Sequence, residues 1–346
     1  MRYIGSKRLL LSFLEEKILQ DVGDVRGKTF VDLFSGTASV SLLFKNLGAR
    51  VIVNDYMTYA YVMGVALVTV NSEPSFIGLR RYGLRGYREI LRYFNSLQPS
   101  KGFFYKNYSP EGTENTQFVR NYFYGVNAAR IDSILNIINK WKTRGLVSHK
   151  EECVLRASLL DAITRISNIS GTYGAFLKID DKRKYNPLTL EPLRFHKSDQ
   201  KHICYNADAL DLIKKIEGDI LYLDPPYNQR QYPPYYHILE TASLGDRPYI
   251  YGKTGRRIYE DKISPFCMQE YALGALRTIL EEAKFRHIFL SYNTDGIIPS
   301  AAIAKLFKAH GPSKLSYRIS RRYKSNGNGK TKKPLKDLLF YVEKKK

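Results

Sequence analysis

The chain has 346 residues, 44% of them hydrophobic, so it can bury a full core and carry a subdomain beside its main domain. Its 55 Lys and Arg outnumber 33 Asp and Glu, and this net charge of +22 favours an anionic partner. The 27 Tyr and 17 Phe favour nucleic acid over an acidic membrane surface, because aromatic rings stack on bases. A charge excess that serves only solubility is the alternative.

Cysteine usage and hydropathy exclude several classes of protein. Cys153, Cys204 and Cys267 are far apart and form no CxxC or Cys/His cluster, which argues against a zinc site or a disulfide framework. The first residues contain no signal-peptide core, and the most apolar later window, residues 59–70, is too short and mixed to span a bilayer. We therefore expect a cytoplasmic protein with no metal and no membrane partner.

The N-terminal part of the chain predicts a helix followed by one βαβ unit. Apolar residues recur at helical spacing over residues 8–19. Residues 29–34 predict a buried strand, 40–47 a helix and 50–55 a second strand, with a turn of small residues at 35–39. Such a unit implies a parallel sheet with a right-handed crossover.

The middle of the chain is different in texture, because helical patterns dominate among polar and basic stretches. Helices are expected at 59–70, 86–97, 116–141 and 151–167, and a strand at 173–180. We interpret residues 73–158 as an inserted, largely helical subdomain. The remaining residues, 1–72 and 159–346, would form the main domain.

The alternation of strands and helices returns at residue 201. Strands are expected at 201–206, 219–223 and 286–292, and helices at 209–216, 235–244, 264–284 and 299–308. A long loop at 245–262 intervenes, and residues 314–322 and 336–342 predict an antiparallel pair. The expected fold class is therefore α/β, a Rossmann-like doubly wound sheet assembled from both ends of the chain.

A rigid turn follows the strand at 219–223 and consists of Asp224, Pro225, Pro226 and Tyr227. The two prolines end the strand, so Asp224 and Tyr227 are held at its carboxyl end, where ligands bind in open α/β sheets. A fixed carboxylate beside an aromatic ring suits a planar base that carries an amino group. A plain Asp-Pro turn that only closes the strand is the alternative.

The first strand–helix turn and the second strand carry a nucleotide-type signal. Gly36 lets the backbone approach a ligand, and the helix that follows directs N–H groups towards it. Asp55 ends the second strand, where an acid can accept hydrogen bonds from a ribose. A tight turn with a helix cap is the alternative interpretation of this pair.

Taken in order, these residues resemble the Dam-like N6-adenine DNA methyltransferases of the D12 class, with the α order of motifs, over roughly residues 1–70 and 160–300. The turn at Asp224 to Tyr227 is similar to the family's catalytic tetrapeptide. The resemblance implies a methyltransferase sheet and transfer of the methyl group of S-adenosylmethionine to a flipped adenine in double-stranded DNA, with the insertion recognising the target. It also implies a restriction system, with a cognate restriction endonuclease that forms no stable complex with this chain.

The same resemblance assigns the cofactor site. Residues 3–7 are similar to the N-terminal motif that contacts the cofactor, and Lys7 would lie near the cofactor carboxylate or the target phosphate. Residues 32–38 resemble the FxGxG loop, although Ala38 replaces the second glycine. Asp55 matches the acid that holds the ribose, and Asp208 the acid that contacts the cofactor adenine. The expected cofactor-binding residues are Tyr3, Lys7, Asp32, Phe34, Ser35, Gly36, Thr37, Asp55, Asp208 and Asp224.

The expected chemistry explains these residue types. The amino group of adenine is a poor nucleophile, because its lone pair is delocalised into the ring. If the Asp224 carboxylate and the Pro225 carbonyl accept its two hydrogens, the nitrogen can become tetrahedral and face the sulfonium methyl. Tyr227 would stack on the base after it leaves the duplex.

Other functions stay open at this point. Methyl transfer to cytosine N4 or an RNA base would fit Ser or Asn at position 224 better than Asp, and a catalytically inactive nucleic-acid-binding homologue would not need Asp224 and Tyr227. A dehydrogenase would need more glycines than residues 34–38 contain. Residues 252–254, Gly-Lys-Thr, resemble the end of a phosphate-binding loop, but Arg247 occupies the place of its first glycine.

Two further groups of residues are candidates for DNA contacts. Tyr232, Tyr235 and Tyr236 either stack on bases or belong to the core, with equal weight. Basic residues of the long loop and of the C-terminal part would contact phosphates: Arg256, Arg257, Arg321, Arg322, Lys324 and Lys330.

Overall fold

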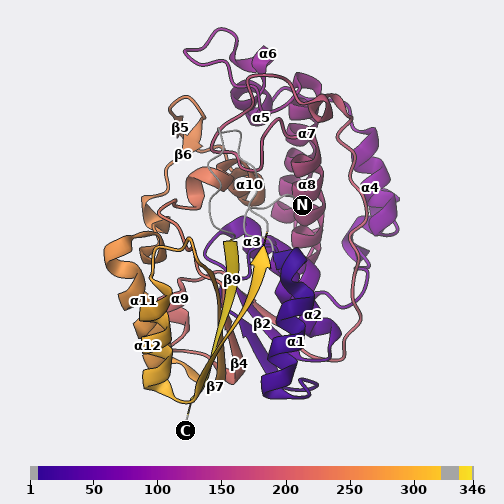
Figure 1. Ribbon diagram of the computed structural model, residues 1–346. Coiled ribbons are helices and arrows are strands. Elements are labelled where there is room, and N and C mark those ends of the chain that lie inside the picture. Colours follow the sequence, from indigo (N-terminus) through magenta and orange to yellow (C-terminus); the bar gives the residue numbers. More distant parts are fainter. Residues whose placement is uncertain (1–6, 321–334, 345–346) are drawn as a thin grey trace.

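A seven-stranded sheet organises the fold (Figure 1), and the computed structural model describes residues 7–320 and 335–344. The strand order is β3-β2-β1-β4-β7-β9-β8. The strands are β1 Thr29–Asp32, β2 Arg50–Asn54, β3 Ile203–Tyr205, β4 Glu217–Leu223, β7 Lys284–Asn293, β8 Ser313–Ser320 and β9 Leu335–Glu343. The sheet thus combines strands from both ends of the chain, which confirms the prediction.

Strand β1, next to the middle strand β4, lies at a topological switch point. It pairs in parallel with β2 on one side and with β4 on the other, while β3 and β7 extend the parallel part. Only β9 and β8 add antiparallel pairs, at the β7 side of the sheet. In such sheets the crevice for ligands opens at the carboxyl ends of the strands beside the switch point.

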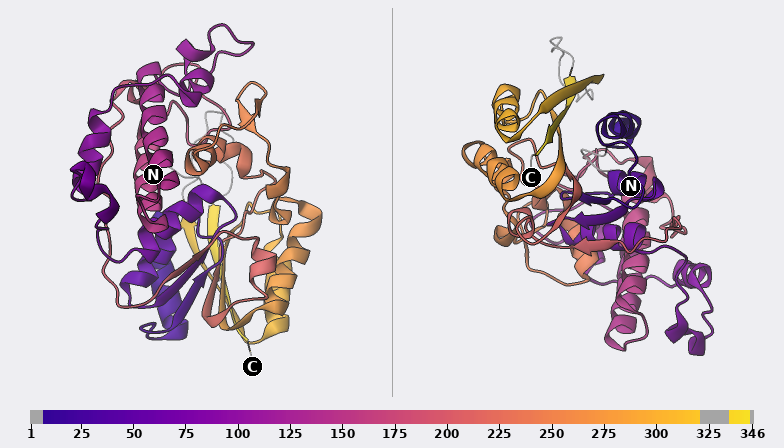
Figure 2. Two further views of the ribbon diagram at one scale, coloured as in Figure 1. Left: turned by 180° about the vertical axis from the view of Figure 1, so that it is seen from behind. Right: turned by 90° about the horizontal axis from the view of Figure 1, so that it is seen from below.

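Helices cover both faces of the sheet, as Figure 2 shows in the view from below. One face carries α1 Leu11–Val22, after a 3₁₀ turn at Lys7–Leu10, and α2 Ser39–Asn46. The other carries α9 Ala209–Leu212, α11 Gln269–Glu282 and α12 Ser300–His310. Strand alternation creates the two cores: Phe30 stacks on Phe44 beneath α2, whereas the neighbouring Val31 belongs to the opposite core.

A helical unit stands beyond the carboxyl ends of the strands and has one continuous apolar core. Its helices are α3 Thr58–Gly64, a π-helix Val65–Thr69, a 3₁₀ helix Ile77–Tyr82, α4 Tyr87–Ser96, α5 Phe103–Tyr108, α6 Pro110–Thr113, α7 Gly125–Thr143, α8 His149–Ile166 and α10 Pro233–Leu244. The expected limit of the insertion at residue 158 falls within α8.

The start of one predicted helix of this unit was wrong, and so was one predicted strand. The helix expected from residue 116 begins only at Gly125, because the backbone N–H groups of Tyr122 and Phe123 both donate to the Tyr108 carbonyl instead of to a helical turn. The strand expected at 173–180 is a series of turns, which the Asn168 side chain ties to the Leu177 carbonyl.

The long loop after α10 contains short elements of its own. A hairpin, β5 Ile250–Tyr251 and β6 Arg256–Arg257, is followed by 3₁₀ turns at Glu260–Lys262 and Pro265–Cys267. The hairpin lies beside α10 at the level of the helical unit (Figure 1). Among the helices of the described residues, none is both long and apolar enough to cross a membrane.

Candidate active site

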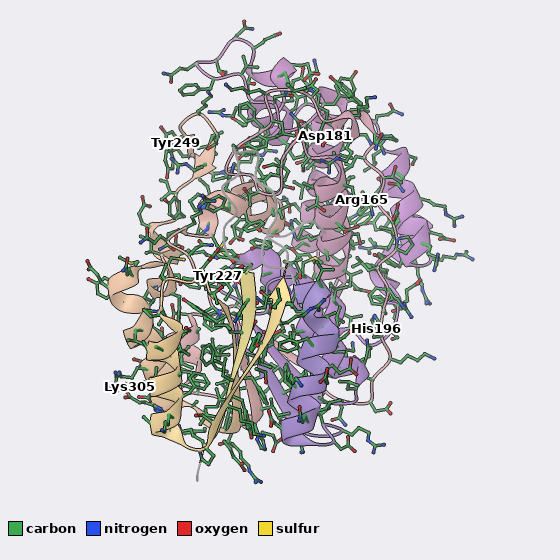
Figure 3. All side chains as sticks on the ribbon, in the orientation of Figure 1. Arg165, Asp181, His196, Tyr227, Tyr249 and Lys305 are labelled. Atoms are coloured by element: carbon green, nitrogen blue, oxygen red, sulfur yellow. The ribbon has the colours of Figure 1, made fainter. Side chains whose placement is uncertain are left out.

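A pocket opens at the carboxyl ends of β1, β2 and β4, and we call it the strand-end pocket. It gathers eleven predicted cofactor-binding and catalytic residues: Lys7, Asp32, Phe34, Ser35, Gly36, Thr37, Asp55, Asp208, Asp224, Pro226 and Tyr227. Pro225 is buried behind this surface. Tyr3, the remaining expected residue, lies outside the described residues. Figure 3 shows Tyr227 at the end of the sheet that faces the helical unit.

Asn54 holds the strand ends that form the pocket floor. This residue is 1% exposed, and its side-chain amide donates to the carbonyls of Leu33 and Ala207 at 3.1 Å each. Its amide oxygen accepts a hydrogen bond from the Ala207 N–H, and its own carbonyl accepts one from Ser35. One buried amide therefore joins the ends of β1 and β2 to the turn before α9.

Asp55 fixes the small-residue turn between β1 and α2. One carboxylate oxygen accepts from the Gly36 N–H at 2.8 Å, and the other accepts from the Met57 N–H at 2.9 Å. Burial raises the pKa of Asp55 to about 6, against these two hydrogen bonds. The carboxylate thus lines the pocket and caps a chain turn at the same time.

Ala38 keeps a backbone conformation that usually requires glycine. Its φ of 57° and ψ of 23° are left-handed, and it is fully buried at the N-terminus of α2. A non-glycine residue in this region costs on the order of 1 kcal/mol. The turn therefore follows a path suited to two glycines although Gly36, with φ of 49°, is its only one.

Asp32 brings an unsatisfied buried carboxylate to the pocket. It is 1% exposed; one oxygen accepts from the Ser41 hydroxyl at 2.6 Å, and Oδ1 has no hydrogen-bond partner among the described residues. Burial raises its pKa to about 7. A cationic ligand in the pocket would compensate this burial.

Replacing Asp32 with Asn should change how stability depends on pH. Because the folded-state pKa is about 7 against an ordinary 3.8, the folded protein holds a proton that the unfolded chain releases. Stability present at low pH is therefore lost as pH rises to about 7. We expect the wild type to lose up to about 4 kcal/mol relative to Asp32→Asn across this window. Urea unfolding at a series of pH values measures this, and a constant difference would contradict it.

Lys7 and the rigid turn after β4 form a charged contact in the pocket wall. The Lys7 ammonium lies 2.8 Å from Asp224 Oδ1, with 10% and 15% of the two side chains exposed. The same ammonium is 5.5 Å from the centre of the Tyr227 ring, which packs edge-on against Tyr292. The Tyr227 carbonyl also accepts a hydrogen bond from the Ile297 N–H. Turn, ring and carboxylate are thus anchored from both sides.

In this contact, burial and the attraction between the two charges shift the pKa of each residue in opposite directions. Burial by itself lowers the pKa of Lys7, but attraction to Asp224 and Tyr227 outweighs it and the pKa is raised. Burial raises the pKa of Asp224, while Lys7 acts in the opposite direction. The raised pKa of Lys7 keeps its ammonium charged beside the carboxylate.

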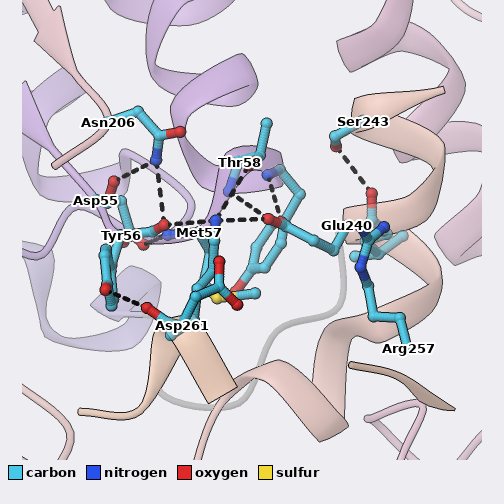
Figure 4. Close-up of polar contacts among 12 residues, drawn as sticks. Asp55, Tyr56, Met57, Thr58, Asn206, Glu240, Ser243, Arg257 and Asp261 are labelled. Atoms are coloured by element: carbon cyan, nitrogen blue, oxygen red, sulfur yellow. Dashed lines mark hydrogen bonds and ion pairs between the residues drawn. The ribbon is translucent and has the colours of Figure 1, made fainter. Parts of the chain in front are cut away.

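A second ion pair, between Glu240 and Lys262, holds the roof of the pocket, and Figure 4 shows the Glu240 carboxylate beside Thr58. Glu240 of α10 is 2% exposed and accepts the N–H groups of Thr58 and Tyr59 at 3.0 Å each. Lys262 donates to Glu240 at 2.8 Å and also to the Tyr56 carbonyl. Because Lys262, Ser264 and their neighbours line the pocket, this pair ties its roof to α3.

Sequence reasoning missed this pair. Glu240 lies on a helix and Lys262 in the long loop, and neither belongs to a recognisable motif. The long loop itself was the only available signal, because loops of this length without regular structure are often functional.

The three tyrosines after the rigid turn have different environments. Tyr236 is buried in the helical core, with its ring 5.1 Å from that of Tyr59. Tyr232 lines the strand-end pocket, and the Tyr235 carbonyl accepts from the Tyr173 N–H at 2.8 Å. The core alternative therefore holds for Tyr236, whereas Tyr232 is placed to contact a ligand.

The candidate phosphate contacts also divide. Arg257 is neutralised by Asp246 at 2.8 Å, whereas the Arg256 guanidinium lies over the Tyr251 ring at 5.3 Å. The remaining candidates lie outside the described residues: Arg321, Arg322, Lys324 and Lys330.

Comparison with known proteins gives extended matches. The Type II methyltransferase M.FokI of Planomicrobium okeanokoites is 41% identical over 352 residues, covering 99% of this chain and 53% of the relative. Modification methylase StsI of Streptococcus sanguinis is 35% identical, covering 100% and 52%, respectively. The Type II methyltransferase M.NlaIII of Neisseria lactamica is 36% identical, covering 94% and 93%. The chain spans about half the length of the first two relatives.

A family model completes the comparison and confirms the resemblance seen in the motifs. It is described as D12 class N6 adenine-specific DNA methyltransferase and matches residues 3–303, which include every pocket residue discussed above. The chain therefore belongs to the D12 class of N6 adenine-specific DNA methyltransferases.

Proposed function

We propose that this protein transfers the methyl group of S-adenosylmethionine to the N6 amino group of an adenine in double-stranded DNA. One observation carries the proposal: the rigid turn from Asp224 to Tyr227 opens into the same pocket as the carboxylates of Asp32 and Asp55. The turn that can hold an amino-bearing base and the two carboxylates that can hold a cationic nucleoside thus line one pocket.

The pocket residues fit S-adenosylmethionine by their chemistry. When bound, this cofactor supplies an electrophilic methyl group on a sulfonium. Asp32 offers an unpartnered buried carboxylate oxygen to a cationic ligand, Asp55 lines the pocket as an acceptor for ribose hydroxyls, and Asp208 is the expected acceptor for the cofactor adenine. Phe34, packed edge-on against Phe266 at 5.2 Å, gives the pocket an apolar aromatic wall.

Asp224 and Pro225 would bind the target amino group. The carboxylate and the carbonyl are acceptors fixed by the prolines, so they can receive the two N6 hydrogens while the lone pair points away from the ring. Lys7 would favour the ionised form of Asp224 against the effect of burial, because its ammonium is 2.8 Å away. An ionised carboxylate can then take the N6 proton that is released after methylation.

Tyr227 would hold the ring of the flipped adenine. The edge-on contact with Tyr292 fixes the plane of the Tyr227 ring without covering both its faces. Tyr227→Phe should therefore retain most of the turnover, whereas Tyr227→Ala should lower kcat by about tenfold, since base–aromatic stacking is worth roughly 1–3 kcal/mol. Steady-state methylation kinetics together with cofactor binding by calorimetry checks this. Equal turnover of Tyr227→Ala and the wild type would refute the stacking role.

We also propose that the inserted residues 73–158 read the target sequence and that the protein acts as the modification partner of a restriction system. The helical unit stands over the carboxyl ends of the strands, which is where a flipped base must enter. The names of the relatives, Type II methyltransferases and a modification methylase, support the restriction setting. A cognate endonuclease would act on the same DNA without forming a stable complex with this protein. Action on DNA would agree with the expected cytoplasmic location.

Transfer of a labelled methyl group tests the activity. Purified protein and methyl-labelled S-adenosylmethionine are incubated in three separate reactions, which contain unmethylated duplex DNA, RNA or protein as the substrate. Label in N6-methyladenine of the duplex is expected. Label in N4-methylcytosine, in RNA or in protein would refute the assigned substrate.

A further inference from the structure

A second cavity lies beside the strand-end pocket, between the segment that follows Tyr227 and the β5–β6 hairpin. Its volume is about 590 Å³, and three cationic side chains line it: Arg230, Lys253 and Arg256. No carboxylate belongs to its lining, whose other polar groups are neutral amides and hydroxyls. Such a wall is complementary to an anion.

The three cations face no carboxylate within the lining of the second cavity. In the part of the chain that the structure describes, none of them forms an ion pair, although the adjacent Arg257 pairs with Asp246. Two are steadied by rings instead, with Arg230 5.9 Å from the centre of Tyr235 and Arg256 over Tyr251. The Arg256 Nε is buried and has no hydrogen-bond partner among the described residues. Ring contacts position a guanidinium but leave its N–H donors available.

Side chains of the helical unit hold the β5–β6 hairpin, which carries Lys253 and Arg256, in place. Arg120 donates to the carbonyls of Gly252 and Lys253 at 3.0 and 3.2 Å. Tyr108 donates to the Gly255 carbonyl, and the Tyr122 hydroxyl, which is 2.7 Å from the Tyr173 carbonyl, is also 3.2 Å from that of Thr254. These three side chains come from the helical unit and occupy the carbonyls of the hairpin turn. The tip is therefore preorganised, which lowers the entropic cost of ligand binding.

One side chain links the two sites. Gln231 lines both the second cavity and the strand-end pocket. Its amide donates to the Ser264 carbonyl at 3.0 Å and accepts from the Ser264 N–H at 2.9 Å. An anion in the second cavity would thus lie next to a ligand bound in the strand-end pocket.

We infer that the second cavity binds backbone phosphates of the strand that carries the target adenine, next to the flipped nucleotide. The inference rests on the proposed function. A flipped nucleotide keeps its backbone connections, so phosphates must pass close to the pocket entrance. Cationic side chains that form no ion pair with a described carboxylate can bind these phosphates there and hold the strand while the base is in the pocket.

Salt dependence of DNA binding tests the inference, once the methylated site has been mapped. Arg230→Gln and Arg256→Gln should each reduce the slope of log K against log salt by about 0.9 and weaken specific and non-specific duplexes similarly. Arg277→Gln, an exposed arginine on α11, is the matched control and should leave the slope unchanged. Unchanged slopes for both cavity variants, or an altered sequence preference without a change in slope, would overturn the inference.

Neutral phosphate replacements locate the contact. A methylphosphonate beside the target adenine should weaken wild-type binding on the order of tenfold, but should not weaken Arg256→Gln further. Equal weakening of both proteins would overturn the inference. Methyl transfer by the wild type distinguishes this inference from the proposed function. If transfer occurs but the slopes of the cavity variants are unchanged, only the phosphate-binding role of the second cavity is refuted. Absence of transfer refutes the proposed function, while slopes altered on a non-specific duplex would still support the cavity as a phosphate site.

Discussion

Asp224→Asn should lower kcat for methyl transfer by about 10²–10³-fold, the range seen when one preorganised polar group is removed from an active site. The amide has nearly the same shape as the carboxylate but no charge, so it accepts the N6 hydrogens more weakly and cannot take up the released proton. It also leaves the buried Lys7 ammonium without its partner at 2.8 Å. Single-turnover kinetics at saturating DNA measures the chemical step directly.

The same strand provides the control for this variant. Asp219 lies near the start of β4, is exposed, and accepts a hydrogen bond from the Thr29 N–H far from the pocket. Asp219→Asn should therefore leave kcat unchanged. The effect of Lys7→Met should be much smaller in the Asp224→Asn background than in the wild type, because the two residues act through one contact. Full turnover by Asp224→Asn would contradict the proposed chemistry.

Glu240→Ala should lower the free energy of unfolding by about 3–5 kcal/mol, because removing one member of a buried ion pair leaves uncompensated polar groups. In this variant, two backbone N–H groups at the start of α3 lose their hydrogen-bond acceptor, and the Lys262 ammonium loses its carboxylate partner. Both losses fall where α10 contacts the start of α3, and Lys262 also lines the strand-end pocket. Urea unfolding monitored by fluorescence of the single Trp141 gives the value.

Two variants bracket this result. Lys262→Met should cost less than Glu240→Ala, since Lys262 is 20% exposed and the two N–H groups keep their acceptor. Glu281→Ala, on the exposed surface of α11, should change stability by less than about 0.5 kcal/mol. A loss below about 1 kcal/mol in Glu240→Ala would mean that the pair contributes little to the fold.

Much of the fold could be predicted where local pattern and final structure agree. The unit from β1 to β2 and the turn after β4 are encoded in short stretches whose apolar runs, small residues and prolines allow few conformations. Most of the candidate site follows from this unit, because Gly36, Asp55 and Asp224 occupy strand ends and parallel strands end at one edge of the sheet.

What could not be predicted depends on contacts between distant residues. The buried roles of Asn54 and Glu240 arise from partners far along the chain, and nothing in their local sequence distinguishes them from surface polar residues. The segment at 173–180 alternates like a strand, yet Asn168 holds it as turns, so tertiary hydrogen bonds override its β-propensity. Lys7 was expected beside the cofactor or a phosphate, whereas its contact with Asp224 depends on how the N-terminus meets β4.

Mapping of modified bases in DNA tests the proposed function most directly. The wild type and Asp224→Asn are expressed in a host that lacks adenine methylation, and the genomic DNA is sequenced by a method that detects modified bases. The wild type should give N6-methyladenine at one defined sequence, and Asp224→Asn should give almost none. DNA with unmodified adenines from cells that contain folded wild-type protein, or with N4-methylcytosine in their place, would contradict it.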